Sequence, residues 1–231
     1  MIGETQIQFL HKFCEQHYVR YYDVQVELVD HLAAAIEQEQ EQDPGLDFTQ
    51  AVNKVYKGFG ITGFSKMVGA YERSARKRYN RKFYQIFKSY FTPPRIFFTL
   101  LLFLILLIPF YIVGVQHQTF LRLIILAYAF IFTLASLFHN RFFKKRHPEP
   151  KKTLLALNSG WPPDNSIFVI ILTQSLFAID KFWEPITYTH LTFFLTVGVY
   201  VLMGISYLAG IRAFVSIYNE AKENFKPAFQ N

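Results

Sequence analysis

The hydrophobic pattern changes character near residue 95 of this 231-residue chain. Residues 1–95 alternate charged and apolar positions, whereas residues 96–231 contain long runs without a charge. A helix needs about 20 mostly apolar residues to cross the hydrocarbon core of a membrane. Four stretches meet or approach that length, at about residues 96–115, 120–138, 165–182 and 191–213. The pattern therefore predicts a soluble domain followed by four membrane spans.

The connections between the four predicted spans favour two antiparallel hairpins. Residues 116–119 alone separate the first two spans, and the second pair is joined by a segment whose Trp183 and Tyr188 suit a membrane–water interface. The fourth span is rich in small residues, which let helices approach closely, so we expect it to pack centrally. These residues are Gly198, Gly204, Ser206, Ala209 and Gly210.

Helical periodicity divides the first 75 residues into three helices, at about residues 3–16, at 21–41 and after Asp47. Asp47 followed by Gln50 resembles a capping box, and the glycines of residues 58–63 end the third helix. The apolar positions on one side of these helices predict the core of a small domain. That core comprises Leu28, Leu32, Val52, Val55, Phe59 and Phe64.

The other side of the helix at 21–41 is acidic at a spacing of three and four residues. We interpret this side as a candidate face for binding a cytoplasmic protein partner. It comprises Asp23, Glu27, Asp30, Glu37 and Glu41.

An aromatic stripe with helical period runs from Phe64 to Tyr90, with cations mostly on other faces. Its later part, residues 76–95, is predicted to be a basic, aromatic juxtamembrane helix lying at the anionic inner leaflet. The prolines of residues 92–94 end it.

Composition and charge add an orientation to this picture. Hydrophobic residues make up 52% of the chain and charged residues 18%, with a net charge of +7. Cations gather before the first span and between the second and third, which predicts that both termini face the cytoplasm. Candidate contacts to anionic lipid are Arg73, Lys77, Arg81, Lys82, Lys88, Lys144, Lys145 and Arg146. The alternative partner, nucleic acid, is disfavoured because these cations lie beside membrane spans.

Three charged residues fall near the predicted outer interface, Arg122, Asp180 and Glu184. An unpaired charge at a membrane edge is costly unless its side chain reaches water. We therefore expect either an ion pair between Arg122 and one of the acids, joining the two hairpins, or three side chains that reach outward independently.

Catalytic and metal-binding motifs give little signal. Glu27 and His31 lie one helical turn apart, but the second histidine of HExxH is missing, so a surface histidine is the favoured interpretation. Ser159, in NSGW, does not stand in the GxSxG pattern of a nucleophile elbow, and no His–Asp pair accompanies it. Cys14 is the single cysteine, which excludes an intrachain disulfide. We predict no enzyme activity, cofactor or metal.

Two segments of the soluble half carry a resemblance. VELVDHLAAAIE at residues 26–37, followed by FTQAVNKVYKGFG at residues 48–60, resembles the HAAS-type signalling domain family over about residues 5–80. The chain is also similar to four-span membrane proteins of Bacteroidetes-type bacteria. The resemblance implies a helical interaction module without catalytic residues.

These features predict an all-α protein: a cytoplasmic helical interaction domain at residues 1–75, the juxtamembrane helix, a four-helix transmembrane bundle at 96–213 and a cytoplasmic tail at 214–231. We expect a regulatory or scaffolding protein of the bacterial inner membrane, with lipids and a cytoplasmic protein as partners. A homo-oligomer is compatible with this pattern. The alternatives are a small transporter or transporter subunit, and a membrane enzyme without a recognisable motif.

Overall fold

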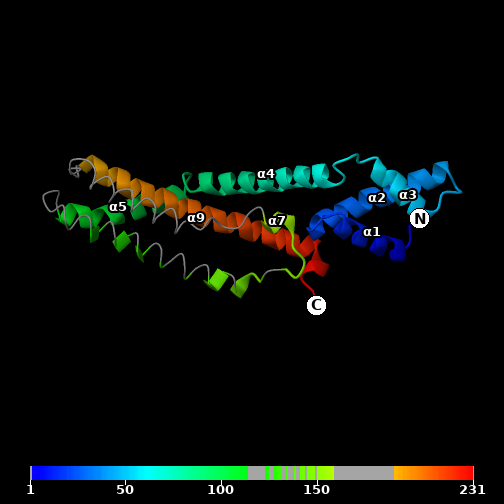
Figure 1. The fold of residues 1–231 in the computed structure, drawn as a ribbon. Coiled ribbons are helices and arrows are strands. Elements are labelled where there is room, and N and C mark those ends of the chain that lie inside the picture. The colour runs from blue at the N-terminus through cyan, green and yellow to red at the C-terminus, as the bar shows by residue number, and fades with distance from the viewer. Residues whose placement is uncertain are drawn as a thin grey trace. The chain divides into compact units, whose positions relative to one another are not determined.

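The protein is all-helical wherever its structure is described (Figure 1). The computed structural model describes residues 2–113, 123–124, 127–128, 130–131, 134, 138, 141–143, 145–148, 150–158 and 190–230. The helices in chain order are α1 Glu4–Gln16, α2 Tyr22–Gln42, α3 Phe48–Lys57, α4 Ser65–Ser89, α5 Arg95–Val113, α7 Leu155–Asn158, α9 His190–Asn224 and the 3-10 helix η1 Lys226–Ala228. The predicted fold class, all-α, is confirmed for these residues.

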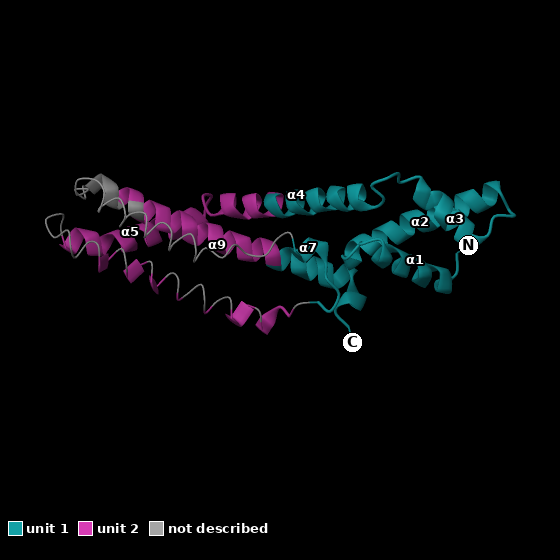
Figure 2. Cartoon of the chain, in the orientation of Figure 1, with its two compact units in different colours: residues 1–80, 150–161, 215–231 teal, residues 81–149, 162–214 magenta. Residues whose placement is uncertain are grey.

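The chain divides into two compact units, drawn in two colours in Figure 2. Unit 1 combines residues 1–80, 150–161 and 215–231, and unit 2 combines residues 81–149 and 162–214. Each unit is therefore assembled from segments that are far apart in the sequence.

The core of unit 1 is built around α2, which packs against α1, α3 and α7. Leu28, Leu32, Val52 and Phe64 are buried, and Val55 and Phe59 are partly buried against them, so the predicted core is correct. Complete burial of a leucine side chain contributes about 1.5–3 kcal/mol to folding. This core explains why the amphipathic helices of the N-terminal half assemble.

Local signals set the ends of α3. Asp47 is its N-cap, because the side chain of Asp47 accepts a hydrogen bond from the Thr49 N–H at 3.0 Å. After α3 the chain turns through Gly60, whose φ of +71° lies in the left-handed region that glycine adopts without strain.

The structure refines two predicted segments. The predicted juxtamembrane segment 76–95 is the later part of α4, which runs without interruption from Ser65 to Ser89, and α5 begins at Arg95. The segment 214–231 is not simply a tail. α9 continues to Asn224, η1 follows, and residues 215–231 belong to unit 1.

Two described helices are long and apolar enough to cross a membrane by length and composition. They are α5, with a mean hydropathy of 2.9, and the part of α9 at Val197–Asn224, with a mean hydropathy of 1.6. They differ in burial: 6% of the apolar window of α5 is buried inside the protein, against 61% of that of α9. The central packing predicted for the last span within a four-helix bundle stays a prediction. The predicted span at 165–182 lies outside the described residues, as does much of the one at 120–138.

Candidate interaction site

The segment at residues 151–158, between the second and third predicted spans, binds to the start of α2 within unit 1. The Tyr22 N–H donates to the Thr153 carbonyl at 2.9 Å, and the Thr153 hydroxyl donates to the Arg20 carbonyl at 3.0 Å. One main-chain and one side-chain hydrogen bond thereby join residues more than 130 positions apart. We call this segment the docking segment.

The carboxylate of Asp23 caps α7 from another part of the chain. Its two oxygens accept hydrogen bonds from the Leu155 N–H at 2.8 Å and the Ala156 N–H at 2.9 Å. The first N–H groups of a helix have no partner within that helix, and a carboxylate both satisfies them and interacts favourably with the helix dipole. Asp23 therefore holds the docking segment by charge-assisted hydrogen bonds, which are stronger than neutral ones.

Side chains of the docking segment complete its attachment. Leu155 is 4% exposed and belongs to the core of unit 1. The ammonium of Lys152 lies 4.2 Å from the centroid of the Tyr22 ring, and the Asn158 amide donates to the Tyr21 hydroxyl at 2.9 Å. An apolar anchor, a cation–π contact and a polar contact thus act together.

The C-terminal end of the chain joins the same unit. The Lys151 N–H donates to the carbonyl of Ala228 at 2.9 Å, and Arg78 of α4 forms an ion pair with Glu220 of α9. Unit 1 is consequently held by contacts among all three of its sequence segments.

The predicted acidic face is partly used inside the protein. Asp23 caps α7, and Glu37 accepts a hydrogen bond from the Ile2 N–H at 2.8 Å. The pKa of Tyr71 is raised, first by partial burial and then by its hydrogen bond with Glu27. Asp30 and Glu41 are exposed along the same helix. The surface that remains open is thus smaller than the sequence predicts, and Asp30 and Glu41 are its freest carboxylates.

The candidate lipid-binding cations are divided between the two units. Arg73 and Lys77 belong to unit 1, whereas Arg81, Lys82, Lys88, Lys145 and Arg146 belong to unit 2. Lys144 lies outside the described residues, as do Ser159 and the three residues of the predicted outer cluster, Arg122, Asp180 and Glu184.

α4 carries eight cations and one carboxylate, a net charge equal to the +7 of the whole chain. The rest of the protein is therefore balanced in charge.

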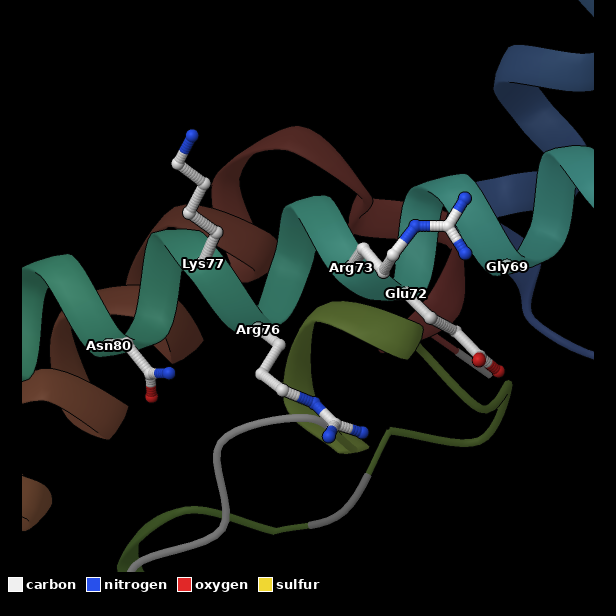
Figure 3. Close-up of a pocket in the computed structure, with 6 residues that line it drawn as sticks. All are labelled: Gly69, Glu72, Arg73, Arg76, Lys77 and Asn80. Atoms are coloured by element: carbon white, nitrogen blue, oxygen red, sulfur yellow. The ribbon is translucent and has the colours of Figure 1, made fainter.

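Residues of α4 line an open depression of about 410 Å³, namely Gly69, Glu72, Arg73, Arg76, Lys77 and Asn80 (Figure 3). The long side chains in Figure 3 spread in different directions instead of converging on one point. We interpret this depression as a charged surface and not as a pocket for one ion.

The docking segment was the part of the site that the sequence did not predict. The cations beside this segment were interpreted as signals of membrane orientation, and no role was predicted for its apolar residues. A signal was present, because Leu154, Leu155 and Leu157 follow closely after a lysine pair in a connecting segment, and all three are buried. Apolar residues in a charged loop indicate a surface that the loop covers.

Comparisons with known proteins identify no relative. No family model matches the chain, and neither the curated proteins nor the solved structures contain a match. The resemblance to HAAS-type domains accordingly stays a prediction from residues 26–37 and 48–60.

Proposed function

We propose that this protein is a multi-pass membrane protein whose helical domain, unit 1, acts as a cytoplasmic regulatory or scaffolding module. The observation that carries the proposal is that unit 1 combines three separate segments of the chain. A domain built from residues 1–80, 150–161 and 215–231 requires the chain to leave it and return to it twice.

The composite domain supports two helix hairpins. A compact unit lies on one side of a bilayer, so a chain that leaves it at residue 80 and re-enters at 150 must cross the membrane an even number of times. The same holds between residues 161 and 215. α5 supplies one crossing in the first interval and α9 one in the second, so each interval needs one partner. The apolar stretches at residues 120–138 and 165–182 are the candidates.

The surface of α5 supports a lipid environment for this helix. Several large apolar side chains of α5 are 59–76% exposed within the protein, namely Phe97, Phe98, Leu104 and Ile112. Large exposed apolar patches are rare in soluble monomers. Lipid removes the cost of this exposure. The excess of cations on the unit 1 side supports a cytoplasmic orientation, because cytoplasmic loops are enriched in lysine and arginine.

The docking segment supports a regulatory role. It connects the second and third proposed spans and is also bound by α2 through Asp23 and Leu155. A change in the arrangement of those spans would pull directly on α2, whose outer side carries Asp30 and Glu41. Unit 1 would in this way report the state of the membrane bundle to a cationic surface of a cytoplasmic protein.

Single introduced cysteines test the membrane arrangement. In intact cells, an impermeant maleimide should label cysteines introduced at His117 and Pro185. Cysteines introduced at Ser74, Lys145 and Glu223 should be labelled only after the cells are permeabilised. The wild-type protein is the control. Its Cys14 is completely buried, and burial raises the pKa of this thiol to about 12, so background labelling should be low. Labelling of Ser74→Cys and Glu223→Cys on opposite sides would overturn the proposal.

Charge substitutions test the interaction role. A cytoplasmic protein that co-purifies with the solubilised full-length chain should be lost with Asp30→Asn/Glu41→Gln. It should be retained with Glu4→Gln/Glu15→Gln, which removes two exposed carboxylates from α1. Equal retention by both variants would contradict a role for the open acidic surface of α2.

A further inference from the structure

The described residues of unit 2 carry an unbalanced positive charge. They include eight arginines and lysines and no aspartate or glutamate. The cations are Arg81, Lys82, Lys88, Arg95, Arg141, Lys145, Arg146 and Arg212. Arg95 and Arg212 are both exposed, and each comes from the end or the body of an apolar helix.

Two of these cations are held at one aromatic ring. The guanidinium carbon of Arg95 lies 5.7 Å from the centroid of the Tyr90 ring, and that of Arg212 lies 5.5 Å from it. Both distances are within the range of a cation–π contact. Tyr90 thus joins the start of α5 and the C-terminal half of α9, and both guanidinium groups lie around one ring.

The surrounding contacts fix this arrangement. Arg95 donates a hydrogen bond to the Ser89 hydroxyl at 2.5 Å, and the Thr99 hydroxyl donates to the Tyr90 carbonyl at 3.1 Å. The Tyr90 hydroxyl is buried, and no described residue accepts a hydrogen bond from it. The site therefore has a surplus of donors and positive charge.

Further cations lie near the same level of α9. The ring of Phe143 contacts that of Phe214 with 5.5 Å between centroids, two residues beyond Arg212. This contact brings the segment with Arg141, Lys145 and Arg146 to α9. Basic residues from two further points of the chain, beside Phe143 and at Arg212, thus lie along the same part of α9.

The site also marks a change in surface chemistry. Arg95 is the first residue of α5, and Phe97 and Phe98 directly after it are 67% and 71% exposed. If α5 spans the membrane, as proposed above, Arg95 lies at the depth of the lipid headgroups. Guanidinium groups bind phosphate oxygens in a bidentate manner, and basic groups beside a membrane span attract anionic lipids.

We propose that Arg95 and Arg212, held by Tyr90, bind the phosphate group of an anionic phospholipid in the cytoplasmic leaflet. The two guanidiniums contact the phosphate oxygens, Tyr90 sets their spacing, and the other cations of unit 2 favour a headgroup with net negative charge. This inference rests on the proposed membrane location. It assigns the phosphate to a lipid, and inorganic phosphate is the competing source of the same chemistry.

Lipid retention by the full-length protein tests this site. After reconstitution in nanodiscs with equal amounts of phosphatidylglycerol and phosphatidylcholine, native mass spectrometry should detect preferential retention of phosphatidylglycerol. Arg95→Gln/Arg212→Gln should reduce that preference about tenfold or more, because each charge-assisted hydrogen bond contributes on the order of one decade of affinity. Arg95→Lys/Arg212→Lys should keep an intermediate preference, because lysine retains the charge without the bidentate geometry.

Three controls separate the possible explanations. Lys12→Gln/Lys57→Gln removes two exposed cations from unit 1 and should leave the lipid preference unchanged. Tyr90→Leu should lower the preference while Tyr90→Phe, which keeps the ring, should largely retain it. Melting temperatures of all variants identify any that fail to fold. If the glutamine or leucine variant does not fold, Arg95→Lys/Arg212→Lys and Tyr90→Phe still test the site.

Several outcomes would overturn the inference. Equal retention of both lipids by the wild type would do so, as would an unchanged preference in the glutamine variant. Displacement of the lipid by millimolar inorganic phosphate would assign the site to free phosphate. If the cysteine labelling gives the expected pattern while the lipid preference is absent, the lipid site is wrong and the proposed function stands. If the protein does not enter nanodiscs, the proposed membrane function fails with it.

Discussion

Helices α2 and α5 have similar lengths of 21 and 19 residues, yet their apolar residues lie in opposite environments. α2 buries Val24, Leu28, Val29, Leu32 and Ile36 against other helices, whereas Phe110 is the one buried residue of α5. Burial from water stabilises α2. For α5 no comparable burial exists within the described residues, so its apolar surface requires a different solvent. The same residue types thus form a protein core in one helix and, under the membrane location proposed above, a lipid contact in the other.

The largest expected effect comes from the same substitution made in both helices. Leu32→Ala should lower the free energy of unfolding of unit 1 by about 2–5 kcal/mol, because a fully buried leucine leaves a cavity. Leu101→Ala on α5, where the side chain is 54% exposed, should change stability in detergent far less. Chemical denaturation followed by circular dichroism measures both. Equal losses would show that α5 is packed like a core helix.

A charge placed on α5 sharpens the contrast further. Leu104→Lys should cost about 2.5–3.5 kcal/mol of membrane insertion, the penalty for a lysine near the centre of a spanning helix. Fractionation of cells should then show less protein in the membrane, with Leu104→Met as the control. Unchanged membrane recovery would argue against α5 as a span.

The cap of α7 should contribute less than a core leucine. Asp23→Ala leaves the Leu155 and Ala156 N–H groups without their acceptors and should destabilise unit 1 by about 1–3 kcal/mol. It should also expose the docking segment to limited proteolysis. Asp30→Ala, an exposed acid of the same helix, is the matched control. Identical proteolysis patterns for the two variants would mean that Asp23 does not hold the segment.

The smallest effect concerns pH. Burial raises the pKa of the Cys14 thiol from 9.0 to about 12, so the fold favours the neutral thiol. Because the unfolded chain loses this proton first, the associated stability is present below pH 9 and declines as the pH rises from 9 towards 12. At pH 8 a thiol reagent should react slowly with folded protein and rapidly after denaturation. Rapid reaction in the folded state would show that Cys14 is accessible.

Local patterns explain how much of this fold could be predicted. Apolar positions at a spacing of three and four residues locate α2 and α3 and identify Leu28, Leu32 and Val52 as core, because this spacing selects one side of a helix. Long uncharged runs locate α5 and α9 for an equally local reason. α4 runs through the domain boundary predicted at residues 75–76, since a change in composition along a helix does not interrupt its hydrogen bonds, and the two units divide within this helix at residues 80–81.

The candidate sites depended on contacts that no local pattern contains. The sequence by itself determined the helical class, the core face of α2 and the two apolar helices, because those follow from the order of neighbouring residues. The tertiary structure alone decided that Asp23 caps a helix more than 130 residues away and that Arg95 and Arg212 meet at Tyr90. A carboxylate on a helix surface has the same local sequence whether it faces water or caps another helix. Its partner is selected by the packing of distant segments, which only the assembled fold defines.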